Sequence, residues 1–188
     1  MDEEKISLIK KAQKGDKNAL SDLIKQEQNN IYTTLYYLKK DDNELNDIMQ
    51  DVLIKISRRI NQLKNPKYFK TWLNQIIINS YYDYLRKNKK YPKALSLNEY
   101  QDEAKVINNN SLLDPSDTVL YSELDYIIKT SIENLPIHYK IPITLREIQG
   151  LSYDEISNIT NTTVGTVKSR IARARALIKD DINRYSRG

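Results

Sequence analysis

Residues 151–179 read LSYDEISNITNTTVGTVKSRIARARALIK, and this stretch decides how the C-terminal part of the chain folds. Ser152 followed three residues later by Glu155 forms a capping box, which predicts that a helix begins there. Asn161 tolerates the left-handed backbone of a tight turn, and Thr163 can cap a following helix. The stretch therefore predicts two helices joined by a short turn.

The second predicted helix, Val164–Ile178, has two chemically different faces. At 100° per residue its apolar residues fall on one inward stripe: Val164, Val167, Ile171, Ala174 and Ile178. The opposite face carries small residues around a single long side chain: Gly165, Ser169, Ala172, Arg173 and Ala176. Lys168, Lys179 and Arg170 border that face, and Thr163 and Thr166 lie at the helix start, where free amides favour phosphate. This pattern predicts a helix-turn-helix with a DNA recognition helix; the alternative is a surface helix whose charges are merely solvated.

Composition narrows the class of protein. The 188 residues include 30 Lys and Arg against 25 Asp and Glu, which favours a polyanionic partner. Cysteine is absent and His138 is the only histidine, so we expect no disulfide, no metal, no cofactor and no histidine-based catalysis. A charged N-terminus and the lack of a long apolar run predict no signal peptide and no membrane insertion, hence a cytoplasmic protein. Few glycines and prolines and no strand-like alternation predict an all-α fold.

The first half of the chain predicts helices over about 3–13, from Gly15-Asp16 to Leu38, and over 44–63, with a break at 41–43. The outer face of the third helix is unusual because charged and amide residues surround an isoleucine: Asp47, Gln50, Asp51, Ile54 and Arg58. Such a residue indicates either a protein-binding patch or an ordinary exposed isoleucine, and this helix alone does not favour one over the other.

A fourth helix, predicted over about 68–87, is apolar or aromatic around most of its circumference. Its one polar stripe comprises Tyr68, Gln75, Asn79, Tyr82 and Arg86, with Trp72 and Asp83 beside it. Aromatic rings mixed with amides are typical of single-stranded nucleic-acid recognition, while the alternative is a set of amphipathic residues lying over a core. The basic residues that follow, up to Lys90, favour the nucleic-acid interpretation.

The remaining chain divides into a linker and a second helical domain. Residues 88–116 lose periodicity, and helices are predicted over 117–134 and from after Pro136 to Gln149. Pro142 lies within the latter, so we expect that helix to begin late or to hold the proline in its first turn. The predicted domains are 1–90 and 117–188, joined by a flexible linker at 91–116.

Four segments, spread over nearly the whole chain, resemble those of a known family: DIMQDVLIKI at 47–56, TWLNQIIINSYYDYLRK at 71–87, TLREIQGLSYDEIS at 144–157 and VGTVKSRIARAR at 164–175. Together with the LP at Leu135, they resemble the bacterial sigma factors of the extracytoplasmic-function (ECF) group, within the sigma-70 superfamily. The resemblance implies two small helical domains, region 2-like and region 4-like. It also implies a factor that is not an enzyme, takes no small-molecule substrate, binds core RNA polymerase and promoter DNA, and is controlled by an anti-sigma factor.

The resemblance also implies roles for particular residues. Asp47, Gln50 and Asp51 match the motif that docks on the polymerase largest subunit, which gives the surface around Ile54 a partner. Asn79 matches the position near which an unstacked base of the melted −10 element is captured, so the stripe with Tyr68, Trp72, Gln75, Tyr82 and Arg86 becomes the −10 surface. The positions facing −35 bases are Ser169, Ala172 and Arg173, with phosphates held by Arg146, Lys168 and Arg170.

Two features depart from the family pattern, and two other functions compete with it. Pro142 is unusual inside its helix, and Ala172 is smaller than the residue in some relatives, so the promoter sequence does not carry over. A free-standing helix-turn-helix regulator would leave the Asp47–Arg58 face and the aromatic stripe without a purpose. A recombinase or transposase would need a nucleophile or a metal-binding carboxylate cluster, for which the N-terminal half offers no convincing candidate.

Overall fold

The computed structural model describes residues 2–38, 42–88 and 123–185, and every regular element in these ranges is helical. The first ranges form α1 (Glu3–Gln13), α2 (Lys17–Leu38), α3 (Asp42–Arg59), the 3-10 turns η1 (Ile60–Gln62) and η2 (Pro66–Tyr68), and α4 (Phe69–Lys87). The last range forms α5 (Glu123–Asn134), α6 (Ile137–Ile143), the π-helical turn η3 (Thr144–Ile148), α7 (Tyr153–Thr160) and α8 (Val164–Tyr185). The all-α prediction is confirmed, and the predicted linker at 91–116 lies outside the described residues. Among the described residues, no helix is long and apolar enough to cross a membrane.

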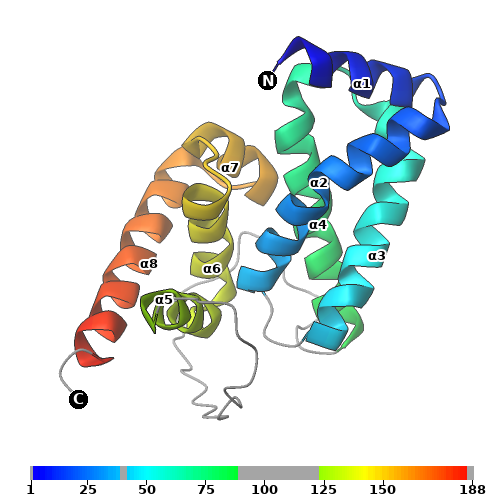
Figure 1. The fold of residues 1–188 in the computed structure, drawn as a ribbon. Helices are drawn as coiled ribbons and strands as arrows, with labels where there is room; N and C mark the ends of the chain where they lie inside the picture. Colours follow the sequence, from blue (N-terminus) through cyan, green and yellow to red (C-terminus); the bar gives the residue numbers. More distant parts are fainter. Residues whose placement is uncertain (1, 39–41, 89–122, 186–188) are drawn as a thin grey trace.

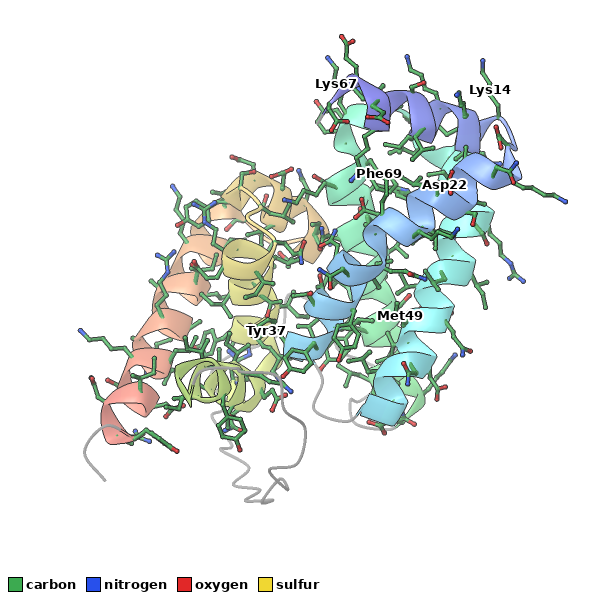
Figure 2. All side chains as sticks on the ribbon, viewed as in Figure 1. Lys14, Asp22, Tyr37, Met49, Lys67 and Phe69 are labelled. Atoms are coloured by element: carbon green, nitrogen blue, oxygen red, sulfur yellow. The ribbon has the colours of Figure 1, made fainter. Side chains whose placement is uncertain are left out.

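Helices α1 to α4 form an N-terminal group. Gly15, at φ +90°, lies in the tight turn between α1 and α2. The Asp16 carboxylate accepts hydrogen bonds from the backbone amides of Asn18 and Ala19 at 2.9 and 3.0 Å, which caps the start of α2. Figure 1 shows α1 lying across one end of α2 and α4. Phe69, labelled in Figure 2, lies beneath α1 at the start of α4 and is 1% exposed. Its burial anchors α4 against the N-terminal helix.

The predicted third helix is correct in its faces and wrong at both ends. Helix α3 already begins at Asp42, so the break predicted at 41–43 does not include Asp42 and Asn43. At the other end the α-helix stops at Arg59 and continues as η1. The residues predicted to face inward are all buried or half-buried: Leu45, Ile48, Met49, Val52, Leu53, Ile56, Ile60 and Leu63.

Helices α5 to α8 form a C-terminal group, in which α6 contains Pro142 and is followed by a π-helical turn. The predicted late start is wrong, since α6 begins at Ile137 and Pro142 lies beyond its first turn. Proline lacks an amide hydrogen and cannot make the usual bond to the preceding turn. The chain then widens into η3, where the Gln149 amide donates to the Thr144 carbonyl at 3.2 Å.

The two groups pack against each other in the described structure. Helix α2 contacts η3 and α5, and α4 contacts α7 (Figure 1). The buried apolar residues of both groups form one connected cluster. The two predicted DNA-reading elements, α4 and α8, therefore belong to a single packed arrangement.

Candidate nucleic-acid interface

The helix-turn-helix has the local geometry that its sequence predicts. The Ser152 hydroxyl accepts the Glu155 amide at 3.2 Å, and the Glu155 carboxylate accepts the Ser152 amide at 2.8 Å, which completes the capping box of α7. Asn161 ends α7 in the left-handed conformation, at φ 50° and ψ 46°. The Thr163 hydroxyl then accepts the Thr166 amide at 3.2 Å and caps α8. These three predictions are confirmed.

The two faces of α8 are separated as predicted, although the helix runs on to Tyr185. Val167, Ile171 and Ala174 are buried, and Val164 and Ile178 are half-buried. The opposite face is exposed throughout: Gly165, Ser169, Ala172, Arg173 and Ala176. A helix surface of this kind can approach the edges of bases in a major groove, with Arg173 as its one long donor.

An aromatic ring that the sequence analysis did not single out arranges the basic side chains beside this face. The Arg146 guanidinium lies 4.8 Å from the centroid of the Tyr153 ring and donates to the Leu151 carbonyl at 2.8 Å. The Lys168 ammonium lies 5.8 Å from the same ring. Two predicted phosphate-binding residues from different elements thus share one aromatic support.

The other basic residues of α8 differ in their exposure and in their bonding partners. Arg175 is bound to Glu147 on η3 at 2.6 Å, and this hydrogen bond raises the pKa of the guanidinium. Arg170 is half-buried and, with Tyr82 of α4, lines a small crevice between the two groups of helices. The predicted phosphate contact at Arg170 therefore lies at the edge of the reading face, whereas Lys168 is exposed.

The six residues predicted for the fourth helix do lie on one side of α4 and its entry turn. Tyr68 is 65% exposed, and Gln75, Asn79 and Arg86 are exposed as well. Trp72 and Tyr82 are half-buried, with Trp72 packed on Phe69 at a centroid separation of 5.8 Å. We call this set the α4 stripe: Tyr68, Trp72, Gln75, Asn79, Tyr82 and Arg86.

The predicted docking face of α3 carries an exposed apolar centre and a charge network. Ile54 is 48% exposed, Asp47 and Gln50 are exposed, and Asp51 is half-buried. The Lys55 ammonium bridges Asp51 at 2.7 Å and Asp83 of α4 at 2.8 Å, and Asp83 also pairs with Arg86. A chain of ion pairs therefore runs from the α3 face to the α4 stripe.

The pKa values around Lys55 follow from this network. Partial burial alone raises the pKa of each carboxyl group, but hydrogen bonds and ion pairing with Lys55 outweigh burial and lower the pKa of Asp51 and Asp83. Burial likewise lowers the pKa of Lys55, and its bonds to the two carboxylates raise it by more. The described residues contain no group of acidic and histidine side chains arranged to hold a metal ion.

Comparisons with known proteins identify both halves of the chain. Residues 23–91 match the family model described as Sigma-70 region 2, and residues 126–178 match Sigma-70, region 4. The ECF RNA polymerase sigma-E factor of Haemophilus influenzae is 36% identical over 179 residues, 94% of each chain. That of Escherichia coli K12 is 32% identical over 182 residues, 93% of this chain and 92% of the relative.

Solved structures share the fold. CnrH, in complex with the cytosolic domain of CnrY, has a TM-score of 0.66 at 17% identity and covers 95% of this chain and 97% of its own. The sigma factor RpoE from Bartonella quintana, in complex with the anti-sigma factor NepR, has a TM-score of 0.69 at 21% identity, covering 87% and 96%. A free-standing regulator or a recombinase would not account for relatives matched over nearly their full length. The chain belongs to the ECF sigma factors of the sigma-70 family, which are non-enzymatic factors that direct transcription initiation.

Proposed function

We propose that this sigma factor docks core RNA polymerase on the outer face of α3 and reads promoter DNA with α8 and the α4 stripe. The domain of residues 1–90 carries α3 and the α4 stripe, the domain of residues 117–188 carries α8, and residues 91–116 link the two. This division agrees with the two family models, whose matches fall within or close to these bounds.

The exposed small-residue face of α8 is the observation that carries the proposal. Ser169, Ala172 and Arg173 are the residues that face −35 bases, and Arg146, Lys168 and Arg170 hold phosphates on either side. The hydroxyls of Thr163 and Thr166 lie at the helix start, 2.9 Å from each other, where backbone amides favour a further phosphate. Arg173 is the only long hydrogen-bonding side chain on the outward face, and it is the residue that distinguishes one base from another.

The α4 stripe reads the melted −10 element. Asn79 supplies an amide that can pair with the edge of an extruded base, and Tyr68, Trp72 and Tyr82 supply ring faces for stacking. Gln75 and Arg86 add a second amide and a positive charge on the same side. A single strand rather than a duplex fits this mixture, because the rings need unstacked bases.

The polymerase contact is centred on Ile54. An isoleucine 48% exposed among Asp47, Gln50 and Asp51 combines an apolar anchor with a polar rim, as protein interfaces do. Because its partner is the transcription machinery, the protein acts in the cytoplasm. Two relatives of similar fold are held in complexes, one with an anti-sigma factor and one with the cytosolic domain of CnrY, and control by an anti-sigma factor is proposed for this chain by analogy.

Run-off transcription with purified bacterial core polymerase tests the proposal, using genomic fragments that include the region upstream of the protein's own gene. We expect initiation that depends on the protein and is lost in Asp51→Ala and Ile54→Asp variants. Arg59, exposed on the same helix but turned away from that face, provides the matched control, and Arg59→Ala should retain activity. No dependence on the protein, together with tight binding to duplex DNA alone, would refute the polymerase contact.

A second pair of variants separates base reading from phosphate binding. Arg173→Ala should cost about 1–3 kcal/mol of discrimination at one base pair of the −35 element. Lys168→Ala should weaken binding to all sequences alike and reduce the slope of affinity against salt by about 1. Equal effects of Arg173→Ala on matched and mismatched duplexes would refute its role in base reading.

A further inference from the structure

Helix α1 lies outside the residues that match the region 2 family model, which begin at residue 23. It is nevertheless firmly attached to the rest of the N-terminal group, because Ile9 and Ala12 are buried. Lys5 pairs with the Glu27 carboxylate of α2, and its ammonium lies 5.8 Å from the centroid of the Phe69 ring. Helix α1 is therefore fixed, and segments bonded to it are held in place.

The segment between α3 and α4, residues 60–68, lies along α1; we call it the α3–α4 turn. Both η1 and η2 contact α1. The Gln13 side-chain amide donates to the Leu63 carbonyl at 2.6 Å and to the Ile60 carbonyl at 3.4 Å. Figure 2 shows Lys67, in η2, at one end of α1 and Lys14, the neighbour of Gln13, at the other end. Helix α1 therefore supports the turn over its length.

The α3–α4 turn ends at the first residue of the α4 stripe. The Asn65 side chain accepts the Lys67 amide at 3.0 Å, and the Tyr68 amide donates to the Asn65 carbonyl at 3.0 Å. Phe69, the next residue, is 1% exposed beneath α1. The Tyr68 side chain is 65% exposed, so its position depends on the backbone that carries it more than on packing of the ring.

The bond from Gln13 meets the turn where regular helical hydrogen bonding has ended. Leu63 follows η1 with an extended backbone, at φ −68° and ψ 105°, and its carbonyl is bonded by the Gln13 side chain instead. Ile60 and Phe69, 4% and 1% exposed, fix the two ends of the turn by packing. Loss of the Gln13 bond would therefore free the middle of the turn and Tyr68, and would leave α3 and α4 in place.

We infer that Gln13 is a positioning residue for reading the −10 element: it fixes the α3–α4 turn so that the Tyr68 ring is placed to stack on an unstacked base. The inference rests on the proposed function of the α4 stripe. Gln13 itself contacts protein and not the strand. The apparent affinity for the strand is the affinity of the correctly placed turn multiplied by the fraction of molecules in that state, so a variant that lowers this fraction binds more weakly with the stripe intact.

The test uses substitutions that separate the hydrogen bond from the size and charge of the side chain. Gln13→Met keeps the length of the side chain and removes the donor, while Gln13→Lys supplies a donor of similar reach. Gln28, exposed on α2, provides matched controls, since Gln28→Met and Gln28→Lys make the same two changes away from the turn. Circular dichroism and urea unfolding establish that each variant is folded. If Gln13→Met is not, Gln13→Asn, which keeps the amide but is one methylene shorter, replaces it with the same expected changes.

Hydrogen exchange of the full-length protein alone tests the support that α1 gives. We expect Gln13→Met to speed exchange of the Lys67 and Tyr68 amides about three- to tenfold, with the centres of α3 and α4 unchanged. Gln13→Lys should restore the exchange of the wild type. Unchanged exchange in Gln13→Met, or exchange as fast in Gln13→Lys, would refute the positioning role of the bond.

Strand binding tests the functional consequence. The full-length protein bound to core polymerase is titrated with the labelled non-template strand of the −10 region of a promoter that it transcribes, and fluorescence anisotropy gives Kd. We expect Gln13→Met to weaken binding about three- to tenfold and Gln28→Met to bind as the wild type does. Gln13→Lys should bind as Gln28→Lys does, because both carry the same added charge. Faster exchange without weaker strand binding would refute the inference and leave the proposed function intact, because Gln13 is not part of the stripe.

Tyr68→Leu separates this inference from the proposed function. In that background Gln13→Met should cause no further loss of strand affinity, since the ring through which Gln13 acts is gone. A further loss as large as in the wild-type background would refute the route through Tyr68. If Tyr68→Leu alone binds the strand as tightly as the wild type, the assigned −10 role of Tyr68 is wrong, and the inference fails with it even where hydrogen exchange shows that α1 fixes the turn.

Discussion

Lys55 joins α3 and α4, the helices that carry the proposed polymerase-docking and −10 surfaces, and its removal should destabilise the N-terminal group measurably. Lys55→Met keeps most of the unbranched stem but deletes the charge that lies 2.7 Å from Asp51 and 2.8 Å from Asp83. The variant leaves two carboxylates near each other without their shared cation. The Ser80 hydroxyl also loses its partner at 3.0 Å.

The size of the effect follows from the exposure of the groups. Fully exposed ion pairs contribute about 0.2–1 kcal/mol, and loss of one partner of a buried pair costs about 3–5 kcal/mol. The Lys55 side chain is 19% exposed, but Asp51 and Asp83 are 40% and 37% exposed, so solvent screens both pairs. We therefore expect Lys55→Met to lower the free energy of unfolding by about 1–2 kcal/mol, nearer the surface range.

Urea unfolding followed by Trp72 fluorescence is the assay, because Trp72 is the only tryptophan and lies on α4, to which Lys55 is bonded. Arg58→Met is the control: Arg58 is exposed on the same helix, and we expect a change within about 0.5 kcal/mol. Added salt should reduce the difference in the free energy of unfolding between Lys55→Met and the wild type, because salt screens the ion pairs.

The dependence on pH has a definite sign. The pKa values of Asp51 and Asp83 lie below their ordinary value of 3.8, so their pairing with Lys55 stabilises the protein above that pH. The difference in the free energy of unfolding between the wild type and Lys55→Met should therefore be largest at pH 7. It should disappear as the pH falls below 3.8 and through the lower pKa values of the folded state. A variant as stable as the wild type at pH 7, or a difference that persists unchanged in acid, would refute the reasoning.

Three further predictions concern the C-terminal group. Ser152→Ala removes the oxygen that caps α7 and should cost about 1 kcal/mol in urea unfolding monitored by circular dichroism; no loss would mean that the cap is dispensable. Asn161→Val places a branched side chain at φ 50° and should cost about 1–2 kcal/mol, whereas Asn161→Gly should be nearly neutral, and equal effects in thermal unfolding would contradict this. Tyr153→Leu removes the ring shared by Arg146 and Lys168 and should weaken −35 duplex binding about three- to tenfold without altering base preference, which competition with a mutated duplex measures.

The features predicted correctly from the sequence are those that depend on neighbours a few residues away. The capping box joins residues three apart, and Asn161 and Thr163 act on their own turn and the next. The faces of α3, α4 and α8 follow from periodicity, because burial of one stripe requires no knowledge of what covers it. The positions of Asp47, Asn79 and Arg173 on exposed faces were predictable for the same reason.

The features missed depend on distant residues or on backbone adjustment. Thr71 and Glu155 are 84 residues apart, and the pattern around Thr71 contains no sign that α7 will lie beside it. The link from Lys55 to Asp83 spans 28 residues and depends on the registration of α3 against α4. Pro142 was expected to delay the start of its helix or to lie in the first turn, whereas α6 begins at Ile137, contains Pro142 and is followed by the π-helical turn η3, in which Thr144 and Leu145 are buried.

The small side chains on the outward face of α8 limit how much sequence that helix can specify. Gly165, Ala172 and Ala176 have no hydrogen-bonding side chain, so in the proposed contact with the −35 element only Arg173 and Ser169 of that face can distinguish one base pair from another. So short a code recurs by chance many times in a bacterial genome. If α8 and the α4 stripe act as proposed, we expect selectivity among genes to require a second match at a fixed spacing, so that promoter specificity depends on both contacts and not on the recognition helix alone.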